Sequence, residues 1–496
     1  MDINIKKKTI NGLFWSINSK SLTHLFNLII TAILARLLLP EDFGIVGMSL
    51  IIIGLVSIIN ESGLTTALIQ KKDLDDSHLH TAFWTSISTG IVLYAGTFLL
   101  SPYVADFFKT DLVELIIKVA SLSFLISSVT IVHRSLLAKN LNFRLVSITE
   151  ISGSLISGTF AVYLAISGFG LWSLVAKNLL NDLIVVLLTL LMYPWKPAFK
   201  FNKTKFNELF GFSIYVTGGN ILKYFRENID YIIIGRVLGA ELLGYYTLAY
   251  TLAVFPATKI VPVITRVVFP AFSLLQDDIV RFRKGYRKLV YSLSLITIPS
   301  LMGLAVVAPE LIIQVYGNKW TPAIVPLQIL CIHGLLESIS RTSRSVFYAQ
   351  GSPETELKLN LLKVVISFPI IYIGSFYGIL GVATTVASLS LFYLLITQST
   401  VNLILQLKWI EYFTDVKTSL FASLLMCISI ILYKHWIYPK FFESNINMLI
   451  SSIIIGIILY IIIIYAFNQD FNKTINTNLK NRISKYKNYI YEKNRS

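Results

Sequence analysis

The sequence predicts an all-α polytopic membrane protein from its apolar content, its few charges and its long apolar runs. Of the 496 residues, 55% are hydrophobic and only 14% are charged, whereas an ordinary soluble domain has about 25% charged residues. The net charge is +16, yet the basic residues form short clusters between apolar runs. A nucleic-acid-binding protein would gather them on one face, so no nucleic-acid partner is expected.

A transmembrane helix needs about 20 mostly apolar residues, and about fourteen such runs follow one another along the chain. The segments between them are short, so any functional site must lie within the membrane region or at its surface. The predicted spans are 11–36, 44–69, 81–105, 112–133, 145–167, 171–193, 208–235, 242–270, 289–315, 323–348, 358–376, 378–404, 415–437 and 446–467.

The lysines and arginines outside these spans orient the chain, because such residues are enriched in cytoplasmic loops. When the N-terminus is placed in the cytoplasm, most loop cations fall on the cytoplasmic side, and both termini are cytoplasmic. The tail at 471–496 interleaves tyrosines with lysines and arginines. This composition suits contact with anionic membrane lipids, and it suits a solvated tail equally well.

A motif at the end of the first span recurs later in the chain. LARLLLPEDFG at 34–44 returns as IGRVLGAELLG at 234–244, an offset of 200 at which Arg, Leu, Glu and Gly keep their places. A second echo, at an offset of 210, matches Arg134 and Ser135 with Arg344 and Ser345. Spans 1–6 and 7–12 are therefore predicted to be two parallel six-helix bundles, as in transporters with a substrate site between the halves. The predicted domains are an N-terminal lobe, 1–200, a C-terminal lobe, 201–410, two additional helices, 411–470, and a basic cytoplasmic tail, 471–496.

The seventh predicted span carries four ionisable residues on one helical face. Lys223, Arg226, Glu227 and Asp230 follow the spacing i, i+3, i+4 and i+7. Each such residue costs about 2.5–3.5 kcal/mol at a helix centre in lipid, so the face must meet a polar interior. It lines a cavity in one interpretation; in another, it forms a ladder of ion pairs within the helix, because Arg226 and Asp230 are four residues apart.

Further polar residues lie in the first, sixth, eighth and tenth predicted spans, and Pro256 and Pro262 interrupt the eighth. The candidates for a substrate cavity are Lys20, His24, Asn27, Lys177, Lys223, Arg226, Lys259, Arg266, Arg341 and Arg344, of which the last two also suit ordinary cytoplasmic anchors. The candidates for ion coupling are Asp182, Glu227, Asp230 and Glu337. Cations outnumber carboxylates, and this surplus favours an anionic substrate such as a phosphate, which arginine binds bidentately. An exporter of organic cations would need the opposite sign.

The repeated motif also suggests a gate. Arg36 with Glu41, and Arg236 with Glu241, lie at the outer ends of corresponding helices. They could pair across the lobes, or they could form a local helix-end motif that sets the loop. Both interpretations remain open at this point.

Enzyme chemistry finds no support in the sequence. The histidines are scattered, with no HExxH, and Cys331 and Cys427 lie inside separate apolar runs. No GxxxxGK[ST] phosphate-binding loop is present. The chain is therefore expected not to be an enzyme, and no metal or cofactor is expected.

Five motifs in order along the chain carry a resemblance to a known family. They are ARLLLPEDFG at 35–44, GLTTALIQKKD at 63–73, GFGLWSL at 168–174, FPAFS at 269–273 and YGNKWTPA at 316–323. With these motifs the chain resembles the Wzx-like polysaccharide and oligosaccharide flippases of the multidrug/oligosaccharidyl-lipid/polysaccharide exporter superfamily, especially the colanic-acid-exporter-like branch. The likeness covers about residues 8–410.

The resemblance implies a bacterial inner-membrane flippase. Such a protein moves a polyprenyl-pyrophosphate-linked oligosaccharide repeat unit from the cytoplasmic to the periplasmic leaflet by alternating access, for O-antigen, capsule or exopolysaccharide synthesis. It also implies coupling to an ion gradient, with H⁺ or Na⁺ as candidates, and contact with polysaccharide polymerase or chain-length machinery. The alternatives are a lipid-linked peptidoglycan-precursor flippase, a cation or drug antiporter of the same fold and, in a different class, a membrane polysaccharide polymerase.

Overall fold

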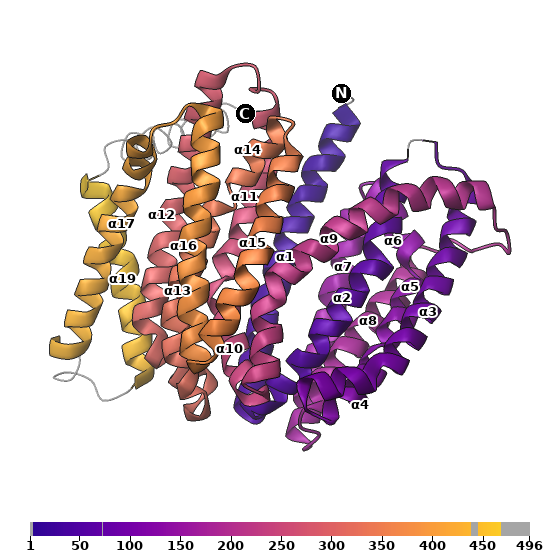
Figure 1. The fold of residues 1–496 in the computed structure, drawn as a ribbon, viewed down its shortest axis with the longest axis horizontal. Coiled ribbons are helices and arrows are strands. Elements are labelled where there is room, and N and C mark those ends of the chain that lie inside the picture. Colours follow the sequence, from indigo (N-terminus) through magenta and orange to yellow (C-terminus); the bar gives the residue numbers. More distant parts are fainter. Residues whose placement is uncertain (1–2, 72, 438–444, 468–496) are drawn as a thin grey trace, which may run out of the picture. The chain divides into compact units, whose positions relative to one another are not determined.

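The computed structural model describes residues 3–71, 73–437 and 445–467, and every element in this part of the chain is helical (Figure 1). Within these ranges, the side chains of 3–14, 16, 17, 61, 62, 211–216, 266, 267, 269, 270, 353 and 445 are not described. The predicted tail at 471–496 lies outside the described residues. The predicted fold class, an all-α polytopic membrane protein, is confirmed.

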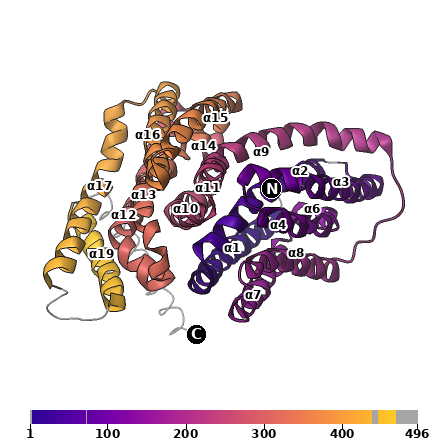
Figure 2. The same cartoon turned by 60° about the horizontal axis from the view of Figure 1, so that its bottom comes forward.

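The chain divides into two compact units. The first contains residues 1–250, 315–326 and 354–386. Its elements are α1 (Ile3–Leu37), α2 (Pro40–Gln70), α3 (Asp76–Phe108), α4 (Leu112–Ala120), α5 (Leu122–Ser128), α6 (Ile131–Lys139), α7 (Phe143–Ile166), α8 (Trp172–Met192), α9 (Lys203–Val237), most of α10 (Ala240–Ala253), η3 (Asn318–Ala323), α15 (Pro353–Ser375) and the start of α16 (Gly378–Leu405). α9 lies along α2 and also contacts α3 (Figures 1 and 2).

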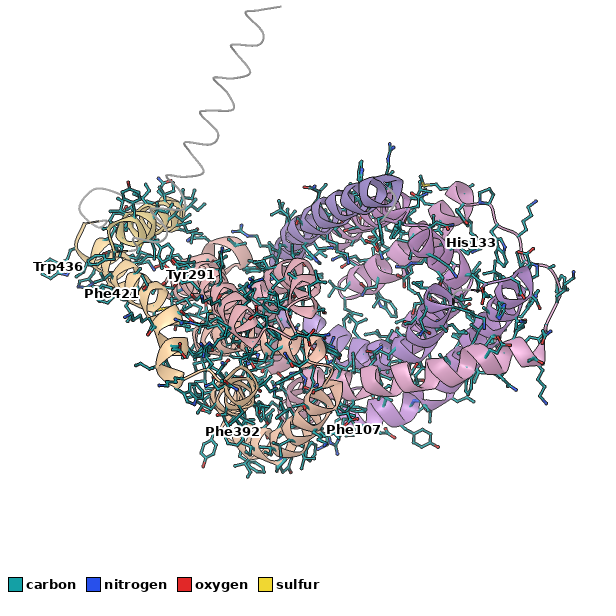
Figure 3. The ribbon with its side chains drawn as sticks, turned by 90° about the horizontal axis from the view of Figure 1, so that it is seen from above. Phe107, His133, Tyr291, Phe392, Phe421 and Trp436 are labelled. Atoms are coloured by element: carbon teal, nitrogen blue, oxygen red, sulfur yellow. The ribbon has the colours of Figure 1, made fainter. Side chains whose placement is uncertain are left out.

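The described residues of the second unit are 251–314, 327–353, 387–437 and 445–467. Its elements are η1 (Pro256–Ile260), α11 (Val261–Ser273), α12 (Ile279–Leu311), η2 (Ile312–Tyr316) as far as residue 314, α13 (Ile324–Ser340) from residue 327, α14 (Ser343–Ala349), the rest of α16, α17 (Trp409–Leu432), η4 (Tyr433–Ile437) and α19 (Asn445–Phe467). α17 and α19, which cover the two predicted additional spans, pack against each other and against α12. Phe421 and Trp436 point outward from this unit (Figure 3), and both are at least half exposed, as expected for lipid-facing side chains.

The helices agree with the predicted spans. Eleven of those described are long and apolar enough to cross a membrane, and two bent pairs raise the number to thirteen. α9, with 35 residues, covers the predicted seventh span but is not among the thirteen, because it carries ionisable residues in mid-helix. The thirteen together with α9 are consistent with the predicted fourteen.

Each of the two bent pairs has its bend at a short break between two helices. The pair Ala240–Ala253 and Pro256–Thr265 bends by 52° at a π-helical turn that begins at Pro256, where proline removes a backbone donor. The pair Leu112–Ser128 and Ile131–Lys139 bends by 49°, and the break lies at Val129 and Thr130. The second bend places α6 as a separate short helix beside α7 and α8.

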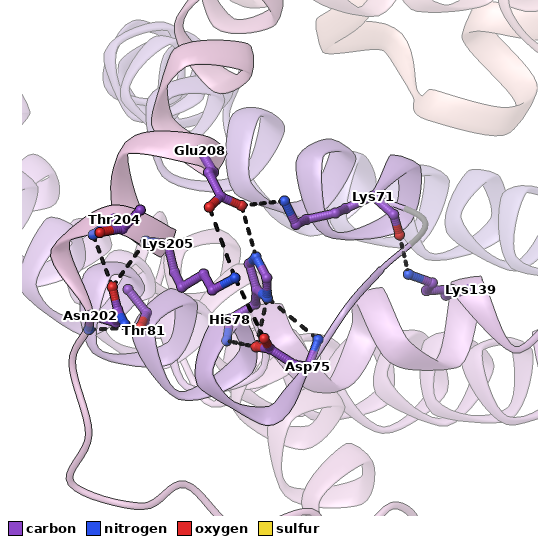
Figure 4. Close-up of polar contacts among 9 residues, drawn as sticks. All are labelled: Lys71, Asp75, His78, Thr81, Lys139, Asn202, Thr204, Lys205 and Glu208. Carbon is purple, nitrogen blue, oxygen red and sulfur yellow. Dashed lines mark hydrogen bonds and ion pairs between the residues drawn. The ribbon is translucent and has the colours of Figure 1, made fainter.

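A polar network joins the end of α2 to the starts of α3 and α9 (Figure 4). The buried His78 ring lies with Nδ1 2.7 Å from Asp75 Oδ1 and Nε2 3.1 Å from Glu208 Oε2. The ammonium of Lys71 lies 2.5 Å from the same Glu208 oxygen, and that of Lys205 lies 3.5 Å from Asp75. Three helix ends are thus held together in the first unit.

The linker between α8 and α9 is bound to the helices beside it. The indole of Trp84 donates to the carbonyl of Ala198 at 2.9 Å, and the backbone N–H of Ala198 donates to His80 Nδ1 at 3.1 Å. His133 of α6, labelled in Figure 3, lies with Nε2 3.0 Å from the carbonyl oxygen of Trp195. These contacts hold the linker against α3 and α6.

Candidate functional site

A polar cavity of about 570 Å³ lies inside the first unit, between α1, α6, α7 and α8. Of its eleven lining residues, Val185 alone is aliphatic, so the cavity offers hydrogen-bonding groups on all its walls. The lining residues are Thr23 and Asn27 of α1, Arg134 of α6, Glu150, Ser154 and Ser157 of α7, and Lys177, Asn178, Asn181, Asp182 and Val185 of α8.

Small residues on α7 build the walls of this cavity. A Cβ atom at Gly153 would lie 2.8 Å from Val185 Cγ2 and 3.0 Å from Asn181 Oδ1, so glycine lets α7 approach α8 closely. A Cβ atom at Gly158 would lie 2.9 Å from Phe26 Cε1 of α1. Small residues bring membrane helices together in this way. The cavity walls are therefore rigid helices in close contact.

The charges that line the cavity balance. Arg134 and Lys177 are cations, Glu150 and Asp182 are carboxylates, and two minus two leaves no formal charge. Arg134 Nη2 lies 3.7 Å from Glu150 Oε1, and Asn181 Nδ2 lies 3.4 Å from Asp182 Oδ1. The cavity thus presents both signs together with hydroxyl and amide groups.

A second cavity, of about 390 Å³, adjoins the same arginine. It lies between α2, α5, α6, α7 and α9, and its polar lining residues are Thr65, Thr66, Ser127, Arg134 and Asn220. Arg134 lines both cavities. Its guanidinium is therefore available to ligands in either one.

Three of the predicted cavity and coupling residues come together in the larger cavity: Asn27, Lys177 and Asp182. Lys20 and His24 lie on α1 within two turns of Asn27 and are not among its lining residues. Whether these residues bind substrate remains a prediction.

The polar face of α9 forms its contacts within the first unit. The guanidinium of Arg226 lies 3.0 Å from Glu227 Oε1. Asp230 is buried, and its Oδ2 accepts a 2.6 Å hydrogen bond from the Tyr246 hydroxyl. Lys223 lies half-buried on the same helix. Arg226 and Asp230 each have a partner close by, and the contact of Arg226 with Glu227 is an ion pair within the helix.

The remaining candidates lie in the second unit. Glu337 and Arg341 of α13 form an ion pair at 3.0 Å. Arg344 is exposed on α14 and donates to the Tyr348 hydroxyl at 3.3 Å. Lys259 is exposed in η1. The side chain of Arg266 lies outside the described side chains.

Both gate arginines donate to distant backbone carbonyls. Arg36 Nε donates to the Val315 carbonyl at 2.9 Å, and Arg236 Nη1 donates to the Phe107 carbonyl at 2.5 Å. The carboxylate of Glu241 accepts from the Tyr245 hydroxyl, and Glu41 is exposed. Each arginine therefore reaches the end of the third helix of the other predicted repeat.

Two of the family-like motifs meet at Arg36. The Trp320 indole is fully buried and donates to the Ala35 carbonyl at 2.8 Å, and the Lys319 ammonium donates to the carbonyls of Arg36 and Leu38. We name this contact of α1 with residues 315–320 the clasp. It binds the motif at 35–44 to the motif at 316–323.

The sequence interpretation missed Arg134 and Glu150. Arg134 lies just outside the predicted span 112–133, where lysines and arginines are expected in a cytoplasmic loop, although the offset of 210 pairs it with the candidate Arg344. Because Arg344 is a cavity candidate, the repeat predicts the same role for its counterpart Arg134. Within the part of the chain that the structure describes, no group of three or more His, Cys, Asp and Glu could hold a metal ion.

Comparison with known proteins decides the family. A family described as "Polysaccharide biosynthesis protein" matches residues 33–325. The chain belongs to this family. The chain is similar to the lipopolysaccharide biosynthesis protein WzxC of Escherichia coli (strain K12), to which it is 31% identical over 77% of this chain and 78% of WzxC. The predicted family resemblance is confirmed.

Solved structures share the fold at lower identity. The lipid II flippase MurJ, in an inward closed conformation, has a TM-score of 0.77 and 15% identity over 92% of this chain and 99% of its own. A multidrug resistance MATE family transporter of the MOP superfamily, in an inward-facing conformation, has a TM-score of 0.59 and 15% identity over 77% of this chain and 95% of its own. The family member described here is thus a multi-pass membrane protein with the fold of these transporters.

Proposed function

We propose that this chain is a flippase that moves polyprenyl-pyrophosphate-linked oligosaccharide repeat units from the cytoplasmic to the periplasmic leaflet by alternating access. The observation that carries the proposal is the polar cavity of about 570 Å³ inside a membrane-spanning bundle. Burying polar groups in a membrane without partners is costly, so such a cavity indicates a polar cargo. Membership of a polysaccharide biosynthesis family identifies that cargo as a glycan intermediate.

The substrate has an anionic pyrophosphate and a neutral or charged glycan, and the chain offers groups for both. The candidates for the pyrophosphate or the glycan remain Lys20, Lys177, Lys223, Arg226, Lys259, Arg266, Arg341 and Arg344. His24 and Asn27 are candidates on the first helix for either part. An ion gradient of H⁺ or Na⁺ drives transport in this proposal, with Asp182, Glu227, Asp230 and Glu337 as coupling candidates. Polymerase or chain-length machinery receives the product.

The fold also suits a lipid-linked peptidoglycan-precursor flippase, because the likeness to MurJ spans nearly the whole chain. The sequence relationship to WzxC favours the polysaccharide substrate, since its identity is about twice as high. A test separates the two substrates. Expression of this chain in a strain depleted of its peptidoglycan-precursor flippase should not restore growth, and restored growth would favour the alternative.

The main test uses deletion and reconstitution. We expect a deletion strain to lose surface polysaccharide and to accumulate a lipid-linked oligosaccharide on the cytoplasmic side, and a plasmid copy to reverse both effects. The purified protein in liposomes should move that extracted lipid between leaflets. An unchanged surface polysaccharide in the deletion strain, with no movement in liposomes, would contradict the proposal.

Localisation has a separate test. We propose an inner-membrane protein with both termini in the cytoplasm. A reporter fused after Ser496, or inserted at 196–206, should show cytoplasmic activity because these segments carry the basic clusters. Periplasmic activity at either place would overturn the orientation.

A further inference from the structure

We propose that the 570 Å³ cavity between α1, α6, α7 and α8 is a subsite for a sugar residue of the lipid-linked substrate, and that it recognises sugar hydroxyl groups rather than the pyrophosphate. The inference rests on the proposed flippase function. It assigns the glycan part of the substrate to the first unit.

The charge balance of the cavity argues for a sugar. A pyrophosphate needs a surplus of cations, preferably arginines that bind two oxygens at once. Here Glu150 lies 3.7 Å from Arg134, and Asp182 lines the same cavity as Lys177. Carboxylates repel a pyrophosphate, but they accept hydrogen bonds readily from sugar hydroxyls. The cations in turn donate to the ring and hydroxyl oxygens of a sugar.

Two buried hydroxyls in the wall lack partners. Thr23 Oγ1 and Ser154 Oγ have no hydrogen-bond partner among the described residues. Ser154 is 6% exposed, and both residues line the cavity. A buried hydroxyl without a partner is destabilising, so each hydroxyl gains a hydrogen bond by turning toward a cavity occupant that can donate and accept at the same point. A sugar hydroxyl does both.

The amides add directional groups to the opposite wall. Asn178, Asn181 and Asp182 lie at neighbouring turns of α8, which packs against α7, and all three line the cavity. Each amide offers both donors and an acceptor, which matches the mixed hydrogen bonding of a pyranose. The volume lies in the range of about 300–1,000 Å³ typical of small-ligand sites. The cavity therefore has the size and chemistry of a carbohydrate subsite.

The test removes the two unpartnered hydroxyls: Thr23→Val keeps the side-chain shape, and Ser154→Ala removes a single atom. The variant Thr23→Val combined with Ser154→Ala is compared with wild type and with Thr159→Val, which removes a hydroxyl from the exposed face of α7. Two probes are used: the lipid-linked oligosaccharide extracted from the deletion strain, and undecaprenyl pyrophosphate without sugar. Affinities are measured by native mass spectrometry in detergent.

We expect the double variant to bind the oligosaccharide lipid about tenfold more weakly, because two hydrogen bonds are lost. Its affinity for undecaprenyl pyrophosphate should change by less than about twofold. The melting temperature of the ligand-free protein should stay the same or rise, since two unsatisfied polar groups are gone. The Thr159→Val control should bind both probes as wild type does.

Other outcomes overturn the inference. Equal losses for both probes would make the cavity a pyrophosphate site, and no loss for either would mean that it holds water alone. If the double variant unfolds, Asn181→Leu measured with the same probes decides by the same criteria. A wild-type protein that binds the oligosaccharide lipid no better than the sugar-free lipid overturns the subsite but leaves transport untouched. A wild type that fails to move the lipid in liposomes overturns the proposed function itself.

Discussion

Arg226 and Asp230 lie one turn apart on α9, and each has found a nearer partner than the other. Arg226 pairs with Glu227 at 3.0 Å, and Asp230 accepts from Tyr246 at 2.6 Å. In a medium of low dielectric constant, a charge without a partner costs far more than a paired one. Arg226 can therefore bind a ligand only if Glu227 gains another partner, or if an anionic group of the ligand takes the place of the Glu227 carboxylate.

Arg226 is predicted to be needed for its charge. Arg226→Ala should abolish surface polysaccharide while the protein still accumulates in the membrane, and Arg226→Lys should keep partial function if charge alone matters. The competing view is that Arg226 only neutralises Glu227. On that view, Arg226→Ala with Glu227→Ala restores export, so normal surface polysaccharide in this double variant would refute a role in phosphate binding.

Asp75 provides a test of pH dependence outside the membrane spans. It caps α3 by accepting from the backbone N–H of His78 at 2.9 Å. This hydrogen bond, against the opposing effect of desolvation, lowers the pKa of Asp75 from 3.8 to about 2. Because the folded pKa lies below the ordinary value, the stabilisation is fully present above about pH 4 and is lost as the pH falls towards 2.

The variant Asp75→Ala should therefore lower the melting temperature by the same amount at pH 8 and pH 6, and by a smaller amount at pH 3.5. Differential scanning fluorimetry in detergent measures this. Asp73→Ala, which removes an exposed carboxylate two residues earlier, serves as the control. A difference that grows as the pH falls would contradict the assignment.

At the scale of single residues, the sequence predicted positions better than partners. It placed Asn27, Lys177 and Asp182 on polar faces that meet in one cavity. It did not find the Tyr246 hydroxyl that binds Asp230, or the carbonyls that bind Arg36 and Arg236. Every residue has a carbonyl group, so side-chain patterns do not reveal which one an arginine reaches.

α2 and α10 cross through a pair of equivalent glycines. A Cβ atom at Gly44 would lie 1.7 Å from the Ala240 carbonyl oxygen, and one at Gly244 would lie 1.9 Å from that of Pro40. The offset of 200 relates Pro40 to Ala240 and Gly44 to Gly244. Gly44 meets Ala240 just as Gly244 meets Pro40, so the contact is reciprocal. A two-fold axis between two repeats produces reciprocal contacts of this kind. This supports the predicted repeat and explains why both glycines keep their places.

Alanine at either glycine should destabilise the protein. Gly44→Ala or Gly244→Ala should cost about 1–3 kcal/mol, because the clash is with backbone that cannot turn aside. The control is Gly96→Ala in α3, where an added Cβ atom meets nothing within 4 Å; helix propensity makes this change neutral or favourable. Melting temperatures in detergent compare the three variants. Equal stability of all three would show that α2 and α10 can separate without cost.

The sequence predicted a helix well where a long apolar run forms it, and less well where the helix breaks. Pro256 predicted the bend between α10 and α11. The break at Val129 and Thr130 has no proline or glycine, so the run at 112–133 was predicted as one straight span. The predicted span ends at residue 133 and does not separate α6 as a helix of its own. Arg134 was therefore expected in a loop rather than in a cavity wall.

At the scale of the whole molecule, two arginine contacts link distant parts of the chain within the first unit. Arg36 lies 279 residues from its acceptor Val315, and Arg236 lies 129 residues from Phe107. In the predicted topology, all four residues lie at the periplasmic side. Contacts between the ends of corresponding helices, made on the side away from the cytoplasm, are suited to hold a transporter closed on that side. These long-range donors favour a gate over a local helix-end motif.

The last prediction tests this gate. In a background lacking Cys331 and Cys427, a cysteine replaces Asn181 in the cavity wall and is probed with a membrane-impermeant thiol reagent from the periplasm. Arg36→Ala with Arg236→Ala should raise its labelling, because both carbonyl contacts are lost. The same two substitutions in a chain that keeps Asn181 should lower transport. Lys109→Gln, which neutralises an exposed cation near Phe107, should leave labelling unchanged. If the double arginine variant also leaves labelling unchanged, the arginines only set the local loops, and the contacts that remain at the clasp, such as that of the buried Trp320 against Phe43, are the next to test as a gate.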